Sequence, residues 1–258
     1  MTGMLEPIVQ MTGIVKRFGR LEALKGVDCT FYKGQITALV GDNGAGKSTL
    51  TKILCGVFAP DEGRLLFDGE EVYWRNPVEA RNAGIETVYQ DLALVDSLSV
   101  SRNFFLGKEP LMAGFFLNRR KMNREALAAV ADLGIRLTDP HCPVSDLSGG
   151  QRKSIAIARS LYFKPKLLIL DEPNAAISIK ESRILLEHVE LVRGKGIPVI
   201  FITHNIHHVY PVADRFILLE QGSKIADVGK HEVTPEELIE AIVTGVGIPS
   251  TGKHAPLP

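Results

Sequence analysis

Gly41-Asp42-Asn43-Gly44-Ala45-Gly46-Lys47-Ser48 decides how this chain of 258 residues folds, because it fits the phosphate-loop pattern G-x-x-x-x-G-K-[ST]. The apolar run 36–40 before it is typical of a buried strand, and residues 49–54 after it open a helix. Its glycines permit positive φ angles and leave no side chain between the backbone amides and a ligand. A polyphosphate would meet N–H donors and the positive end of a helix dipole. The stretch therefore predicts a nucleoside triphosphate site.

Specific side chains of the loop have expected roles. Lys47 is expected to place its charge between the β- and γ-phosphates, and the Ser48 hydroxyl to hold the Mg²⁺ that bridges them. Thr49, directly after the loop, is counted with it. A chance glycine-rich turn is the alternative, and the flanking strand and helix disfavour it.

The bulk composition excludes several classes of protein. Thirty basic and thirty acidic residues cancel, so no global field gathers nucleic acid or an anionic membrane. Cys29, Cys55 and Cys142 are widely spaced without a C-x-x-C pair, which disfavours a disulfide framework or a zinc site. Residues 1–7 lack the apolar core of a signal peptide, and no apolar run approaches the ~18 residues of a membrane span. We expect a cytosolic protein that a partner holds at any membrane it serves.

The order of elements predicts an α/β fold. Strands 8–15 and 27–31, joined through a basic turn at 16–19, suggest a small antiparallel β layer. Apolar strands that alternate with helices later in the chain imply a mostly parallel sheet covered on both faces. We expect a nucleotide-binding core from residues 1–90 and 165–244, and a mobile tail at 245–258. The further strands are expected at 64–68, 85–89, 167–170, 199–202 and 215–219, and the helices at 77–82, 180–192, 206–213 and 235–244.

Residues 91–164 predict an inserted helical lobe. Helices are expected at 100–106 and at 124–133, the second capped by Asn123. Between them, the apolar stretch 115–117 adjoins three basic residues at 119–121. This segment is either a packed loop with solvated charges or part of a docking face for a partner.

Three polar residues, Gln90, Asp171 and His204, each follow directly on an apolar strand. Parallel sheets bind ligands outside the carboxyl ends of their strands, so these residues should converge on the edge that carries the phosphate loop. Asp171 would take the second shell of the Mg²⁺ through water. Glu172 is the better candidate for polarising the attacking water, because its carboxylate can accept a proton or orient the nucleophile.

A second anion cradle is expected at Ser148-Gly149-Gly150-Gln151, where a helix begins. One chain with one triphosphate does not need two cradles. The economical explanation is a head-to-tail pair of chains, in which the cradle of one closes on the γ-phosphate held by the other.

These motifs, in this order, resemble those of ATP-binding-cassette ATPases over about residues 8–244. The resemblance implies a RecA-like P-loop NTPase fold with an antiparallel β layer and a helical subdomain. It also implies that adenine stacks on Phe18, that Gln90 touches Mg²⁺ and reports the γ-phosphate, and that His204 contacts the γ-phosphate and orients Glu172. We expect His207 and His208 to be helix-surface residues.

One departure from the family follows Glu172-Pro173. The family usually runs to Ala-Leu-Asp, whereas residues 174–178 end in Ser178, a weaker and uncharged acceptor. Either hydrolysis is slower, or the contact across the dimer is made otherwise. This variation resembles the cassettes of ribose, fructose and xylose importers, as do residues 84–94, 103–107 and 180–183.

The resemblance implies a homodimeric, Mg²⁺-dependent ATPase subunit, peripheral at the cytoplasmic face of the inner membrane. Its partners would be transmembrane permease subunits and, indirectly, a periplasmic or extracellular sugar-binding protein. A cassette for another solute shares every catalytic residue. A soluble cassette acting on ribosomes or nucleic acid is disfavoured by the absence of paired cassettes, a coiled-coil insertion and a basic arm in this sequence. We expect no nucleic-acid partner, and nothing here identifies the sugar.

Overall fold

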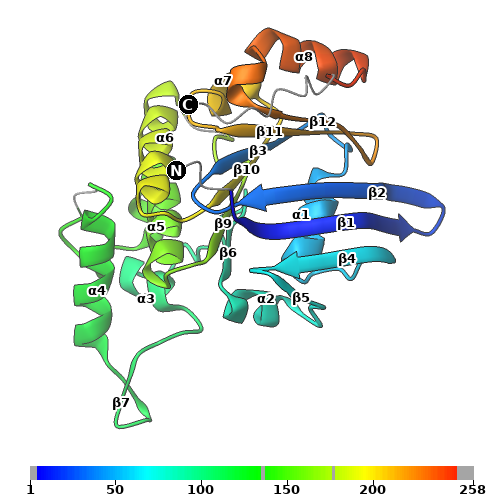
Figure 1. Cartoon of the computed structure of the whole chain (residues 1–258). Helices are drawn as coiled ribbons and strands as arrows, with labels where there is room; N and C mark the ends of the chain where they lie inside the picture. Colours follow the sequence, from blue (N-terminus) through cyan, green and yellow to red (C-terminus); the bar gives the residue numbers. More distant parts are fainter. Residues whose placement is uncertain (1–4, 135–136, 176–177, 249–258) are drawn as a thin grey trace.

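The computed structural model describes residues 5–134, 137–175 and 178–248. Within them two sheets lie side by side, with helices over the larger sheet (Figure 1). The expected α/β fold is confirmed. Most of the expected tail, residues 249–258, lies outside the described residues; Gly245, in a left-handed conformation, ends the last helix.

The larger sheet contains parallel strands and one antiparallel edge strand, β12, which the sequence analysis missed. Its central strand β3 is buried along its whole length, as expected for a strand covered on both faces. In spatial order the strands are β12 (Ser223–Gly229), β11 (Arg215–Glu220), β3 (Ile36–Val40), β10 (Val199–Thr203), β9 (Leu167–Asp171) and β6 (Ile85–Val88).

The smaller sheet is antiparallel, as expected. The predicted turn at 16–19 is wrong, because Lys16, Arg17 and Phe18 continue the first strand and pair with the second up to Leu21. Lys16 bonds Asp61 at 2.8 Å and Arg17 bonds Glu62 at 2.7 Å, so acids at the start of the next strand of this sheet hold the basic residues of this segment. In spatial order the strands are β2 (Leu21–Tyr32), β1 (Pro7–Phe18), β4 (Glu62–Phe67) and β5 (Glu70–Glu71).

The larger sheet separates two hydrophobic cores, because successive side chains of a strand point to opposite faces. On β3, Ile36, Ala38 and Val40 enter one core, whereas Leu39 enters the other together with residues of the smaller sheet and of α1. The smaller sheet, α1 (Lys47–Leu54) and α2 (Pro77–Ala83) thus cover one face. The second face is covered by helices that include α6 (Ile179–Gly194), α7 (Ile206–Val209) and α8 (Pro235–Thr244).

Helices α3 (Val100–Phe105), α4 (Arg119–Ala131) and α5 (Gly149–Tyr162) lie together at one side of the molecule (Figure 1). The expected start of α4 is wrong: Asn118, not Asn123, caps it by accepting a hydrogen bond from the Lys121 amide. The division into a nucleotide-binding core and a helical lobe stays a prediction. Among the described helices, none has the length and apolar composition needed to cross a bilayer.

Candidate nucleotide site

The phosphate loop joins β3 to α1 in a conformation that requires glycine at two positions. Gly41 has φ 151°, and a Cβ there would lie 2.2 Å from the Leu219 carbonyl oxygen. Gly46, at φ 105°, is the N-cap of α1, and a Cβ there would lie 2.9 Å from the Ala23 carbonyl oxygen. The loop is therefore pressed against the ends of β2 and β11, and its amides stay open to a ligand.

Lys47, the first residue of α1, folds back over the loop. Its Nζ donates to the carbonyl oxygens of Gly41 at 2.8 Å and Asp42 at 2.9 Å. Burial lowers the pKa of Lys47, and the negative charge of Glu172 opposes that shift. Since a buried cation gains most from a negative partner, this ammonium group is prepared for a phosphate.

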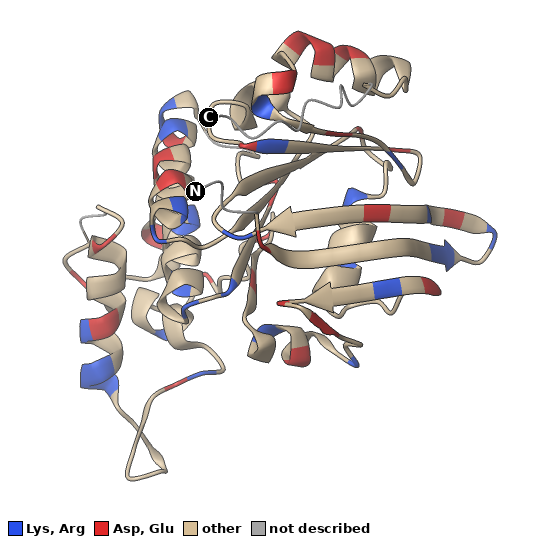
Figure 2. Ribbon diagram, viewed as in Figure 1, with Lys and Arg blue, Asp and Glu red and all other residues tan. Residues whose placement is uncertain are grey.

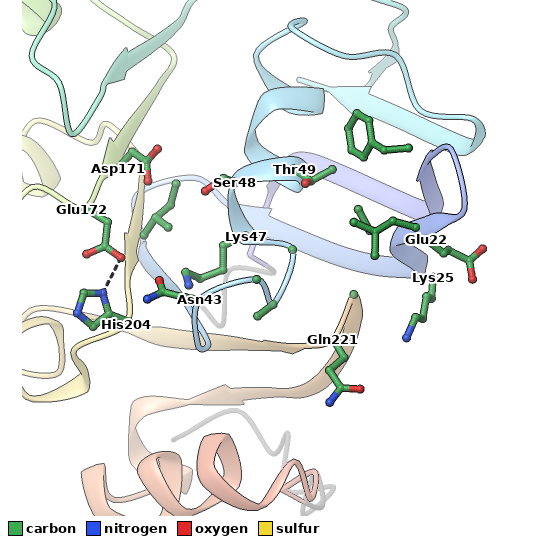
Figure 3. A pocket seen from close by; sticks show the side chains of 18 of the residues that line it. Glu22, Lys25, Asn43, Lys47, Ser48, Thr49, Asp171, Glu172, His204 and Gln221 are labelled. Atoms are coloured by element: carbon green, nitrogen blue, oxygen red, sulfur yellow. Dashed lines mark hydrogen bonds and ion pairs between the residues drawn. The ribbon is translucent and has the colours of Figure 1, made fainter.

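One cavity of about 730 Å³ collects the predicted site residues (Figure 3). This volume is in the range of small-molecule and cofactor sites. Gly41 and Asp42 do not line it, and they act from behind through their contacts with Lys47. The predicted residues that line it are Phe18, Asn43, Gly44, Ala45, Gly46, Lys47, Ser48, Thr49, Gln90, Asp171, Glu172 and His204.

Two hairpin segments line the same cavity and were missed from the sequence. One is the start of β2, including Glu22 and Lys25; the other is the turn between β11 and β12, at Gln221 and Gly222. The Gly222 amide donates to the Ala45 carbonyl at 3.0 Å, which fixes this turn against the phosphate loop. The Gln-Gly pair, with φ 46° and 82°, was an available turn signal ahead of the charged strand β12.

Phe18 presents an aromatic ring at the rim of the cavity. Its side chain is half-exposed, and Phe58 supports it edge-on at a centroid distance of 5.2 Å. The Lys16 ammonium group lies 5.7 Å from the centroid of the same ring, and Phe18 lines the cavity. An exposed aromatic ring at the rim of a cavity suits stacking of a base.

Glu172 and His204 form a hydrogen-bonded pair at the carboxyl ends of β9 and β10. His204 Nδ1 lies 2.9 Å from Glu172 Oε1, and the two side chains point toward one another (Figure 3). The Glu172 backbone has φ 48°, an unfavourable conformation for a residue with a side chain, and its amide donates to the Ile202 carbonyl at 3.0 Å. Such strain concentrates at functional sites, and here it aims the carboxylate into the cavity.

The side chains with oxygen atoms near the phosphate loop are suitable ligands for a hard divalent cation. Burial, followed by the charge of Glu172, raises the pKa of Asp171, so a cation beside this carboxylate would relieve the unfavourable charge. Ser48 and Gln90 contribute a hydroxyl and an amide oxygen to the same cavity. The described residues contain no cluster of three or more His, Cys, Asp and Glu side chains suited to a metal. Mg²⁺ fits such a site, because it commonly keeps waters and substrate phosphates among its ligands.

Gln90 lies in the loop that follows β6, and this loop is hydrogen-bonded to α5 and α3. Arg159 of α5 donates to the carbonyl oxygens of Leu92 and Ala93, both at 3.2 Å. Asn103 of α3 exchanges hydrogen bonds with the backbone of Val95. A displacement of Gln90 would therefore be transmitted to α3 and α5 through these hydrogen bonds.

The predicted second cradle lies away from this cavity. Ser148 is the N-cap of α5 and forms a capping box with Gln151. Together with Gly150 these residues line a different cavity, against α6. Two amides of this turn already have partners: the Gly150 amide donates to Glu181 Oε1 at 3.0 Å, and the Ser148 amide donates to Gln151 Oε1 at 3.0 Å. Acidic and amide side chains of the same chain thus occupy the anion position.

Glu181 also bonds Ser178, the residue that stands where the family usually has an aspartate. Its Oε2 accepts from the Ser178 amide at 3.0 Å and from the Ser178 hydroxyl at 2.9 Å, which caps α6. These bonds, the Ser178 amide first, lower the pKa of Glu181. Lys153 of α5 donates to the Pro173 carbonyl at 2.6 Å. The segment after Glu172 is therefore tied to α5 from two sides, although residues 176–177 lie outside the described residues.

Comparison with known proteins agrees with this geometry. Residues 24–175 match the family described as ABC transporter. The chain is 43% identical to a xylose/arabinose import ATP-binding protein of Sulfolobus acidocaldarius, over 93% of this chain and 95% of that protein. It is 42% identical to a fructose import ATP-binding protein of Rhizobium meliloti, over 95% and 96%. A ribose import ATP-binding protein of Caldanaerobacter subterraneus subsp. tengcongensis is 39% identical, and the match covers 48% of that protein.

Solved structures give the same result. An ATP-binding cassette of an ABC transporter in its ADP conformation is similar with a TM-score of 0.79 at 28% identity, over 92% of this chain and 95% of that one. A dimeric cassette in a post-hydrolysis state, bound to ADP and Pi, has a TM-score of 0.74 at 24% identity, which shows the fold alone. With the phosphate loop, the acids at the strand ends and the serine-glycine turn in one fold, the chain belongs to the ABC transporter family as an ATP-binding cassette.

Proposed function

We propose that this chain is the ATP-hydrolysing subunit of a monosaccharide importer, peripheral at the cytoplasmic face of the membrane. The observation that carries the proposal is the Glu172–His204 pair, held at 2.9 Å in the cavity that the phosphate loop lines. The relatives named for xylose/arabinose, fructose and ribose import support a monosaccharide as the transported solute.

In the proposed reaction, Glu172 orients the attacking water and accepts its proton, while His204 holds the carboxylate in place. Lys47 and the loop amides stabilise charge on the phosphates as the bond to the γ-phosphate breaks. Phe18 would stack on adenine. Ser48, Gln90 and Asp171 would hold Mg²⁺, which when bound with the nucleotide neutralises charge on the phosphate oxygens.

The serine-glycine turn supports a homodimer. Because Ser148 and Gly150 line a cavity separate from the nucleotide site, they would reach a γ-phosphate only on a second copy of the chain. A dimeric relative of the same fold is known. The Arg159 contacts to the loop after Gln90 would transmit dimer closure to α5 and from there to permease subunits. A separate sugar-binding protein would deliver the solute.

Steady-state phosphate release tests the catalytic assignment. The purified chain should hydrolyse Mg-ATP, and Glu172→Gln should reduce kcat by orders of magnitude while ATP binding persists. Full activity in that variant would remove Glu172 from its role.

The transported solute needs a second experiment. The chain would be reconstituted with the permease and the binding protein that co-purify with it, and a panel of sugars and amino acids would be added. A monosaccharide should raise ATPase activity. Stimulation by a solute of another class would contradict the proposed substrate and leave the catalytic assignment intact.

A further inference from the structure

An apolar hairpin, residues 111–117, projects from the helical side of the molecule (Figure 1). It consists of β7 (Leu111–Met112) and β8 (Phe116–Leu117). Phe115 at its tip is 89% exposed and Phe116 is 68% exposed, and the remaining large apolar side chains of the hairpin are exposed too. Contiguous exposed apolar side chains mark an interaction surface more often than isolated ones do.

The hairpin has a defined shape although the side chains at its tip are exposed. Ala113 and Gly114 both have positive φ, 52° and 79°, as in the tight turns that match the twist of a hairpin. Positive φ is unfavourable for alanine. The Asn118 amide donates to the Pro110 carbonyl at 2.8 Å and closes the base. The turn at Ala113 is therefore strained, and it holds the Phe115 and Phe116 side chains exposed.

A basic collar, residues 119–121, follows directly on the hairpin. Arg119, Arg120 and Lys121 form the first turn of α4, where the helix dipole favours acidic residues, and that turn contains no acid. Within the described part of the chain, no carboxylate lies within 4.0 Å of the Arg119 or Arg120 guanidinium. Figure 2 shows basic residues at this end of α4 and an uncharged hairpin below it. The positive φ of Ala113 and the basic first turn of α4 thus both go against local preferences, and two such departures close together are typical of a functional surface.

We propose that the apolar hairpin inserts its tip into the interface of an anionic lipid bilayer, while the basic collar binds the lipid phosphates. Aromatic residues favour the membrane interface, and basic residues near an anionic surface add attraction. The whole chain has no net charge, so the attraction must come from this local cluster. The apolar tip would enter the apolar layer of the bilayer, and the basic collar behind it, in which Arg119 and Arg120 have no carboxylate partner among the described residues, would lie at the anionic headgroups.

This inference does not depend on the proposed catalytic function, because lipid binding is measured without ATP. The sequence contains one tryptophan, Trp74, in a different part of the fold. A Trp74→Phe/Phe115→Trp variant of the whole chain would report the environment of the hairpin tip. Its emission should shift to the blue, and brominated lipids should quench it, with vesicles of phosphatidylcholine and phosphatidylglycerol. Phosphatidylcholine alone should give a smaller effect, and added salt should weaken binding.

Sedimentation with the same mixed vesicles measures affinity. Phe115→Ser/Phe116→Ser should weaken binding at least tenfold, and Arg119→Gln/Arg120→Gln should weaken it by about tenfold. The matched control is Tyr73→Ser/Val78→Ser, which removes two exposed apolar side chains outside the hairpin and should leave binding unchanged. Basal ATPase activity should stay the same in all three variants.

Two results would overturn the proposal. One is a chain that does not bind anionic vesicles; the other is equal binding by the Phe115→Ser/Phe116→Ser variant and the wild type. If that variant binds vesicles as the wild type does but no longer co-purifies with the permease, the hairpin docks on protein and not on lipid.

Discussion

Replacing His204 by alanine removes the hydrogen bond that orients Glu172. A hydrogen bond to a charged group contributes about 1.5–3 kcal/mol. The His204 side chain is 56% exposed, so water competes for the carboxylate and we reduce that range to about 1–2 kcal/mol. Since each 1.36 kcal/mol changes a rate tenfold, the loss of orientation alone should lower kcat by about 5- to 30-fold. A contact of His204 with the γ-phosphate would add to this effect.

The Michaelis constant for Mg-ATP should change by less than about threefold, because Phe18 and the phosphate loop, which we propose bind the nucleotide, lie on other elements. Steady-state phosphate release at saturating Mg-ATP, with a thermal melt of each variant, separates catalysis from unfolding. His204→Gln keeps a donor near Glu172 and should recover part of the rate. His207→Ala, on the exposed surface of α7, is the control. A kcat within twofold of wild type, or an equal loss in the control, would refute the orienting role.

Three further changes test other parts of the structure. Glu181→Gln should strengthen the ATP-dependent dimer by about three- to tenfold in gel filtration of a Glu172→Gln background, because a neutral amide releases the Gly150 N–H more easily; a weaker dimer would contradict this. Arg159→Met should leave basal ATPase activity above about half of wild type and abolish its stimulation by the reconstituted permease; retained stimulation would show that the contacts to residues 92 and 93 transmit nothing. Two lysines hold the pKa of Asp68 at about 2, so its stabilising effect is present above its ordinary pKa and is lost as pH falls toward 2. Asp68→Asn should therefore flatten the acid-unfolding curve between about pH 5 and pH 2, and an unchanged slope in circular dichroism would oppose this assignment.

Much of the nucleotide cavity could be predicted because its residues sit at the ends of apolar strands. Asp171, Glu172 and His204 follow buried runs, and parallel strands bring such ends to one edge. The strand β12 escaped prediction because its sequence mixes charged and apolar residues at an edge of the sheet. Its turn, which includes Gln221, was missed with it.

Other features depend on contacts between distant residues. Asn118 and Asn123 are both good helix caps, and the structure uses the first, whose amide also closes the hairpin base at Pro110. Likewise, the sequence marks Ser178 as a lost acid, but not that Glu181 lies next to the Gly150 amide. No local pattern links positions 150 and 181, because the contact arises from the packing of α5 against α6.

The central claim is that each subunit holds half of a nucleotide clamp and its partner completes it. Sedimentation velocity of the Glu172→Gln variant, with and without saturating Mg-ATP, tests this most directly. The account predicts a monomer without nucleotide, a stable dimer with Mg-ATP, and a return to monomer when Ser148→Arg blocks the cradle. A Glu172→Gln protein that binds Mg-ATP and remains monomeric would contradict the claim.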